Sequence, residues 1–128
     1  MPHITIEYSA NLGERTDIQA LCEALRAEAA GIEAFPTPGI RVRALRADHF
    51  SIADGDPKHA FVDISVRLRA GRPQNVKEDA VKRLFQAAQD FLKPVLETGS
   101  LALSLEMRDI DPDLSPKTGT IREHMGTA

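Results

Sequence analysis

Hydrophobic and polar residues alternate along four short stretches of the chain, which predicts four strands that each bury one face. In the first stretch, residues 3–9, the apolar side is formed by Ile4, Ile6 and Tyr8. The alternation returns near residues 40, 61 and 101. Its apolar positions there are Ile40, Val42 and Ala44, then Val62, Ile64, Val66 and Leu68, and finally Leu101, Leu103, Leu105 and Met107.

Between these strands, two stretches repeat their apolar residues at helical spacing. These positions are Ile18, Leu21, Cys22, Leu25 and Ala29 in the first stretch, and Val76, Ala80, Val81, Leu84, Phe85, Ala88, Phe91, Leu92 and Val95 in the second. Thr16 and Gln19 have the pattern of a capping box, and Gly31 is placed to end the first helix. We expect Asn75 to cap the second helix and Pro94 to kink or end it.

The chain therefore reads strand–helix–strand twice, in pseudo-repeats of approximately residues 2–48 and 58–111. Such a unit normally pairs its two strands in parallel through a right-handed crossover, and equal repeat lengths suggest an internal duplication. We expect the turn-rich residues 48–58 to join the halves, with a hairpin as one option. We expect one domain over residues 1–128, with a duplicated β-α-β fold of the α/β (α+β) class. Its four-stranded sheet would carry two helices on one face.

With both helices on one face, the other face of the sheet is left uncovered. Its expected residues are Thr5, Asp63, Ser65, Ala102 and Ser104. Since a sheet face is rarely left unpacked, we expect oligomerisation to cover it. The last residues, 112–128, lack apolar periodicity and contain several Pro and Gly residues. They form an arm that either docks on a neighbouring subunit or frays.

Composition is that of an ordinary folded domain, with 128 residues, 42% hydrophobic and 27% charged. The net charge of −3 gives no basic stripe for nucleic acid or a membrane surface. The single cysteine, Cys22, has no partner for an internal disulfide, and no spacing of His and Cys residues indicates a metal site. Because the start has no signal-peptide pattern and no apolar run of about 20 residues exists, we expect a cytoplasmic protein.

Pro2 is the candidate for chemistry at the start of the chain. Removal of Met1 would leave proline as the terminus, and its secondary amine is a base when neutral. An apolar pocket and nearby cations would both lower the pKa of this amine toward neutrality, where general acid–base catalysis is efficient. Proline after the initiator methionine is common, so Pro2 gains weight mainly because it leads directly into a strand.

Three arginines are candidates for binding an anion. Arg41 and Arg43 share one side of the second strand, and Arg72 lies on the turn after the third strand. Guanidinium groups bind carboxylates through paired hydrogen bonds. Some strand arginines, a group that also includes Arg67 and Arg69, are expected to be solvated or to form salt bridges. Arg72, on a turn, is the least easily explained by packing.

Five segments, taken together and in order, resemble a known family. They read MPHITIEYS at residues 1–9, GIRVR at 39–43, ADG at 53–55, AFV at 60–62 and AGR at 70–72. The chain resembles the 5-carboxymethyl-2-hydroxymuconate isomerases of the tautomerase superfamily over nearly its whole length. The resemblance implies a homotrimer with sites at subunit interfaces. Pro2 would act as general base and then acid, while Arg41 and Arg72, with Arg43 as a backup, would bind carboxylates of a small anionic dienol.

The implied reaction moves a proton from a 2-hydroxyl group to a distant carbon and requires no metal or cofactor. Three alternatives remain. The first is a tautomerase of another enol acid, such as a phenylpyruvate-like acid, and the second is a dehalogenase-like hydratase. The third is a non-catalytic, oligomeric ligand-binding module, which retention of Met1 would favour.

Overall fold

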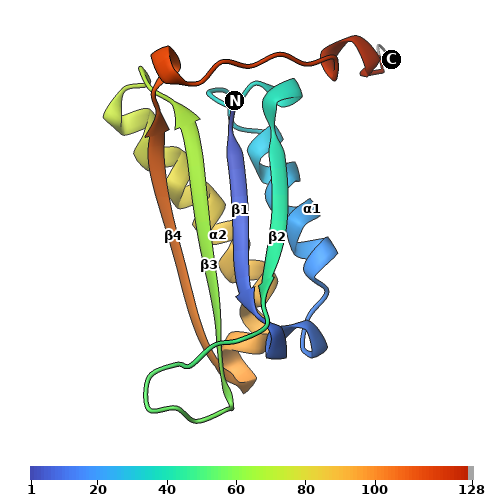
Figure 1. The fold of residues 1–128 in the computed structure, drawn as a ribbon, viewed down its shortest axis with the longest axis vertical. Coiled ribbons are helices and arrows are strands. Elements are labelled where there is room, and N and C mark those ends of the chain that lie inside the picture. Colours follow the sequence, from blue (N-terminus) through green and yellow to red (C-terminus); the bar gives the residue numbers. More distant parts are fainter. Residues whose placement is uncertain (127–128) are drawn as a thin grey trace.

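Four strands and two helices make up the fold in the computed structural model, which describes residues 1–126 (Figure 1). Along the chain these are β1 (His3–Ser9), α1 (Ile18–Ala30), β2 (Arg41–Ala47), β3 (His59–Arg69), α2 (Gln74–Thr98) and β4 (Ser100–Ile110). The strand order across the sheet is β2-β1-β3-β4, and both helices lie behind it in Figure 1. The predicted fold class is confirmed.

Each half of the chain forms a parallel pair of strands joined through a helix. β1 pairs in parallel with β2, and β3 pairs in parallel with β4, while β1 and β3 join the halves as antiparallel neighbours. The suggested hairpin between the halves is wrong because β2 and β3 are not adjacent. Residues 48–58 instead form a long loop that passes the end of β1, where the Asn11 amide donates to the His59 carbonyl over 2.7 Å.

The predicted helix boundaries need three corrections. The N-cap of α1 is Asp17 and not Thr16, since the Asp17 carboxylate accepts from the Ala20 N–H over 3.0 Å. The N-cap of α2 is Pro73 and not Asn75. α2 also continues through Pro94 to its end at Thr98, because Pro94 lies on the exposed side, where water can bond the backbone carbonyl that proline leaves free. Gly31 is confirmed as the C-cap of α1.

The core lies between the sheet and the two helices. Of the alternating residues predicted to face inward, Ile4 and Ile6 of β1 and the four of β3 are fully buried, while Tyr8 of β1 is partly buried. They pack against apolar residues of α1 and α2. The principal members are Ile4, Ile6, Val62, Ile64, Val66, Leu68, Leu21, Leu25, Leu84 and Leu92. This layer fixes which residues point the other way, toward the uncovered face.

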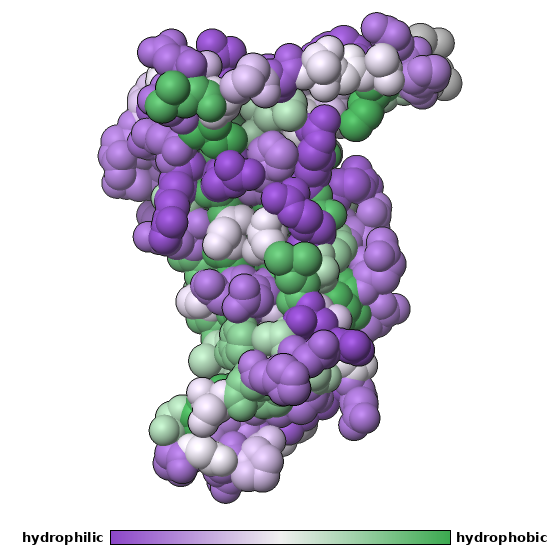
Figure 2. Space-filling view, viewed as in Figure 1, coloured by the Kyte–Doolittle hydropathy of each residue, from purple (hydrophilic) through white to green (hydrophobic). Residues whose placement is uncertain are grey.

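The face of the sheet opposite the helices is open, as predicted. Asp63, Ser65, Ala102 and Ser104 are all exposed there. Figure 2 shows this side of the molecule, where hydrophilic side chains alternate with smaller hydrophobic areas. No helix within residues 1–126 combines the length and the apolar character that crossing a membrane requires.

Candidate active site

Pro2 lies immediately before β1 and is held firmly by its neighbours. Its side chain is less than 2% exposed. The N–H of Arg41, at the start of β2, donates to the Pro2 carbonyl over 3.1 Å, which extends the β1–β2 ladder to Pro2. The start of the chain is therefore part of the sheet and not a loose tail.

Gly39 makes room for Pro2. A Cβ atom at position 39 would lie 3.3 Å from Pro2 Cδ and 3.3 Å from Met1 Cα, which is tighter than ordinary contact. The same residue's carbonyl accepts a hydrogen bond from Arg41 Nη1 over 2.9 Å. Gly39 thus places the pyrrolidine ring of Pro2 close to the guanidinium of Arg41.

Replacing Gly39 with valine should push Pro2 out of position and lower kcat by about 10- to 100-fold, since small misplacements of a reacting group are costly. Steady-state kinetics with a dienol carboxylate would measure the effect. Gly13→Val is the matched control because a Cβ at residue 13 meets nothing within 4 Å. Equal kcat in Gly39→Val and the wild-type chain would contradict this role for Gly39.

Basic side chains gather beside Pro2 because of the strand register. His3 pairs with Arg41 on one side and with Arg67 on the other, so the three side chains leave the sheet on the same face. Arg43 Nη1 lies 3.4 Å from His3 Nδ1. The predicted residues Arg41 and Arg43 are therefore brought to the same end of the sheet as Pro2.

Arg72 lies on the turn after β3 and, unlike Arg41, is not among the residues that line the two cavities beside Met1. Its Nη1 donates to the Arg69 carbonyl and its Nη2 donates to the Ala34 carbonyl, each over 3.0 Å. The guanidinium thus ties the turn after β3 to the loop after α1. Five N–H donors are present on a guanidinium, so Arg72 retains donors for an anion.

Positive charge at this site is not neutralised by nearby carboxylates. Among residues 1–126, none of the cations around the chain start has a carboxylate oxygen within 4 Å. These cations are Arg41, Arg43, Arg67, Arg69, Arg72 and Lys117. A cluster of unpaired cations attracts anions and repels itself when empty, so the arrangement suits an anionic ligand.

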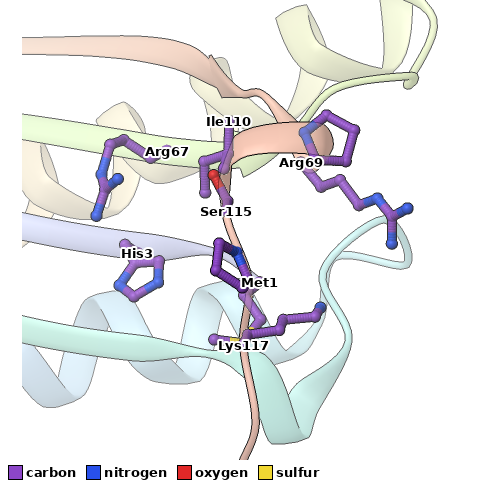
Figure 3. Close-up of a pocket in the computed structure, with 9 residues that line it drawn as sticks. Met1, His3, Arg67, Arg69, Ile110, Ser115 and Lys117 are labelled. Atoms are coloured by element: carbon purple, nitrogen blue, oxygen red, sulfur yellow. The ribbon is translucent and has the colours of Figure 1, made fainter.

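Two cavities open on either side of Met1. The first, of ≈ 190 Å³, is lined by residues that include His3, Arg67, Arg69 and Lys117 (Figure 3). The second, of ≈ 440 Å³, is lined by residues that include Gly39, Arg41 and Lys117. Since Met1 and Lys117 line both, these two side chains separate one cavity from the other.

The surroundings of the site favour the neutral forms of two basic groups, the terminal amine and His3. Burial is the main cause that lowers the pKa of the terminal amine, which belongs to Met1, below its usual 8.0, and neighbouring positive charges lower it further. These charges belong, in decreasing order, to Lys117, Arg72, Arg69 and Arg41. Burial, followed by the charges of Arg67, Arg43 and Arg41, likewise lowers the pKa of His3 below 6.5. An amine at this position is deprotonated more readily than a free one.

Three residues at the site were not predicted from the sequence. Arg67 and Arg69 were grouped with solvated strand arginines, but both line the smaller cavity. Their spacing of two on β3 places them on one face, and only the β1–β3 register shows that Arg67 lies beside His3. Lys117 comes from the arm, where no periodic pattern indicates its position. Within residues 1–126, no group of three or more His, Cys, Asp or Glu side chains is arranged to hold a metal ion.

Comparison with known proteins identifies the family. The family model described as 5-carboxymethyl-2-hydroxymuconate isomerase matches residues 2–125. The chain belongs to this family. It is 31% identical over 121 residues to the 5-carboxymethyl-2-hydroxymuconate Delta-isomerase of Escherichia coli, a match covering 94% of this chain and 96% of the relative. The predicted resemblance and enzyme class are confirmed: the chain is an isomerase of the tautomerase superfamily.

Solved structures share the fold closely. A 5-carboxymethyl-2-hydroxymuconate delta-isomerase superposes with a TM-score of 0.92 at 28% identity, covering 100% of this chain and 95% of the other. The corresponding isomerase from Deinococcus radiodurans R1 gives 0.88 at 30% identity, covering 96% and 92%. A fused 4-OT, described as a symmetric trimer, has the same fold with a TM-score of 0.62 at 19% identity over 85% of each chain.

Proposed function

We propose that this isomerase acts on 5-carboxymethyl-2-hydroxymuconate or a similar dienol carboxylate, with Pro2 as the general base and then the general acid. The observation that carries the proposal is the position of Pro2, which is buried at the head of β1 among cations without carboxylate partners. The relatives from Escherichia coli and Deinococcus radiodurans are named for this substrate. Conversion of an anionic enol acid requires a base that takes its proton and positive charge that binds its carboxylates. A buried amine among cations supplies both.

Loss of Met1 is the first requirement of the mechanism. It would free the Pro2 nitrogen and remove Met1, one of the two residues that line both cavities, so that the cavities can join in front of Pro2. The substrate then occupies the joined space in front of that nitrogen. Retention of Met1 would leave Pro2 as a peptide nitrogen, which has no basic lone pair.

The proton transfer causes no net oxidation or reduction and needs no second reactant. Neutral Pro2 takes the proton of the 2-hydroxyl group, the O–H electrons form the C=O bond, and the double bonds shift along the chain of the substrate. The protonated amine then returns that proton to the distant carbon, giving the conjugated ketone. Arg41 and Arg72, with Arg43 beside His3, bind the carboxylates and stabilise the negative charge of the intermediate.

We also propose that the functional form is a homotrimer. The open face of the sheet exposes Leu45 and Ala102 together with polar side chains, and it has no covering layer within residues 1–126. The fused 4-OT with the same fold is described as a symmetric trimer. Analytical ultracentrifugation should give three times the mass of the chain, and Ala102→Arg on the open face should lower it. A wild-type monomer would refute this part of the proposal.

Intact mass and an ultraviolet assay test the function together. We expect the purified chain to lack Met1 and to convert the dienol to the conjugated ketone. Turnover of phenylpyruvate enol alone would indicate the other tautomerase, and hydration of a haloacrylate would indicate the hydratase. Retained Met1 without turnover of any enol acid would favour the non-catalytic binding module. Cytoplasmic location belongs to this proposal and can be checked by cell fractionation.

Arg72 should contribute both charge and structure. Arg72→Ala is expected to raise KM for a dienol carboxylate about tenfold, because one charge-assisted hydrogen bond is worth about 1.5 kcal/mol or more. It should also lower the melting temperature, because the bonds to the Arg69 and Ala34 carbonyls are lost. Arg72→Lys keeps the positive charge but not the paired N–H donors of the guanidinium. It therefore separates the effect of charge on KM from the effect of the two backbone hydrogen bonds on the melting temperature. An unchanged KM in Arg72→Ala would remove Arg72 from the substrate site.

A further inference from the structure

The segment after β4 is an exposed arm with a defined course. At its start the Asp111 carboxylate accepts from the Asp113 N–H over 2.9 Å, and the Leu114 N–H donates to the Asp111 carbonyl over 3.2 Å. This turn redirects the chain at the end of β4. In Figure 1 the arm then crosses the end of the sheet that carries the N-terminus and continues beyond β2.

The arm reaches the proposed substrate site at Ser115, Pro116 and Lys117. These three residues line the smaller cavity, opposite His3 and Arg67 of the sheet. Figure 3 shows Lys117 beside Met1, with Arg67 and His3 on the adjoining strands. The next residues of the arm, including Thr118 and Gly119, line the larger cavity. The arm therefore forms one wall of both cavities.

Lys117 lines both cavities together with Met1, whereas Arg122, another cation of the arm, lines only the larger one. Among the cations near the chain start, Lys117 contributes most to the lowered pKa of the terminal amine. Within the described residues its ammonium group has no carboxylate oxygen within 4 Å. A lysine ammonium offers three donors on a flexible stem, so it can follow a carboxylate placed at variable distance.

We propose that the arm is the roof of the substrate site and that Lys117 binds a second carboxylate of the substrate, so that the arm selects dicarboxylates over monocarboxylates. The inference deepens the proposed function and rests on it. Arg41, Arg43 and Arg72 bind the other carboxylates, and the arm adds Lys117 from the opposite part of the cavity walls. A substrate with a single carboxylate can bind the arginines but has no carboxylate for Lys117. It therefore lacks the binding energy that Lys117 would contribute.

Kinetics with two substrates tests the selection. Lys117→Ala should raise KM about tenfold for the dienol dicarboxylate, whereas KM for the enol of phenylpyruvate, a monocarboxylate, should change less than twofold. Lys117→Arg should restore most of the lost affinity. Lys82→Ala is the control, since Lys82 is an exposed lysine of α2 on the helical side of the sheet. A KM that rises equally for both substrates would overturn the proposal.

Binding of unreactive acids tests the roof independently of turnover. By calorimetry, adipate should bind the wild-type chain at least tenfold more tightly than hexanoate, and Lys117→Ala should reduce this ratio to near unity. An unchanged ratio, or no binding of adipate by the wild-type chain, would refute the role of Lys117. If the ratio behaves as expected but no enol acid is turned over, the dicarboxylate site stands and the catalytic proposal for Pro2 fails.

Discussion

Replacement of Pro2 by alanine is expected to lower kcat by about 100-fold while changing KM less than threefold. General acid–base catalysis by a positioned group typically contributes 10²–10⁴-fold, and Pro2 is proposed to be that group. Alanine is small enough to permit removal of Met1, so the variant still begins with an amine. It loses the rigid ring that Gly39 packs against. The carboxylates are bound by arginines, which the substitution leaves in place.

The pH profile gives this prediction a second measurement. Burial and the charges of Lys117, Arg72, Arg69 and Arg41 lower the pKa of the Met1 amine below its usual value. We expect the same surroundings to lower the pKa of the Pro2 amine once Met1 is removed, so kcat/KM should rise with pH through that pKa and level off above it. Burial, followed by the charges of Arg67, Arg43 and Arg41, also lowers the pKa of the neighbouring His3, which favours its uncharged form. Arg69→Ala removes one positive charge, so its acid limb should move to higher pH.

The control and the refuting result are simple. Pro57→Ala changes an exposed proline in the loop at the other end of β1, and it should leave kcat and the acid limb unchanged. Intact mass must first show that Met1 is absent from each protein. A Pro2→Ala variant with wild-type kcat would eliminate Pro2 as the base, whatever its effect on KM. An acid limb that stays at the wild-type pH in Arg69→Ala would contradict the proposed environment of the amine.

The sheet and helices could be predicted because burial repeats with a fixed period. Ile4 and Ile6 are buried as their alternation requires, and so is every second residue of β3 from Ala60 to Leu68. Boundaries were harder because neighbouring residues compete for the same role. Thr16 and Asp17 are both good N-caps, and the sequence does not show which side chain reaches the free N–H groups. Pro94 can remain within α2 because its exposed side is open to water.

Only part of the candidate site could be predicted from the sequence, because the proximity of the other residues depends on how the strands pair. Pro2 and Arg41 stand out by residue type and position. Arg67 is indistinguishable from a solvated strand arginine until the register places it beside His3. Lys117 follows a segment without any period, and its position depends on the turn at Asp111. Chemical type can be read from one strand, but proximity requires the register of two strands.

Truncation of Ile64 to alanine should show how strongly the two faces of β3 differ. Ile64 is fully buried at the centre of the sheet, where it pairs with Ile6 of β1 and Leu105 of β4. Removing three carbon atoms from such a site leaves a cavity under the helices, which typically costs 2–5 kcal/mol of the free energy of unfolding. Urea denaturation, followed by circular dichroism at one fixed protein concentration, would measure the loss.

Ser65→Ala is the matched control, one residue further along the same strand. Ser65 points to the open face, and loss of its hydroxyl leaves no cavity in the core, so its substitution should cost far less free energy of unfolding than Ile64→Ala does. The difference between the two variants tests the alternation on which the placement of the basic cluster depends. Arg67 lies two residues beyond Ser65 and therefore shares its face. Comparable losses of the free energy of unfolding in Ile64→Ala and Ser65→Ala would mean that β3 does not separate a core face from the open face.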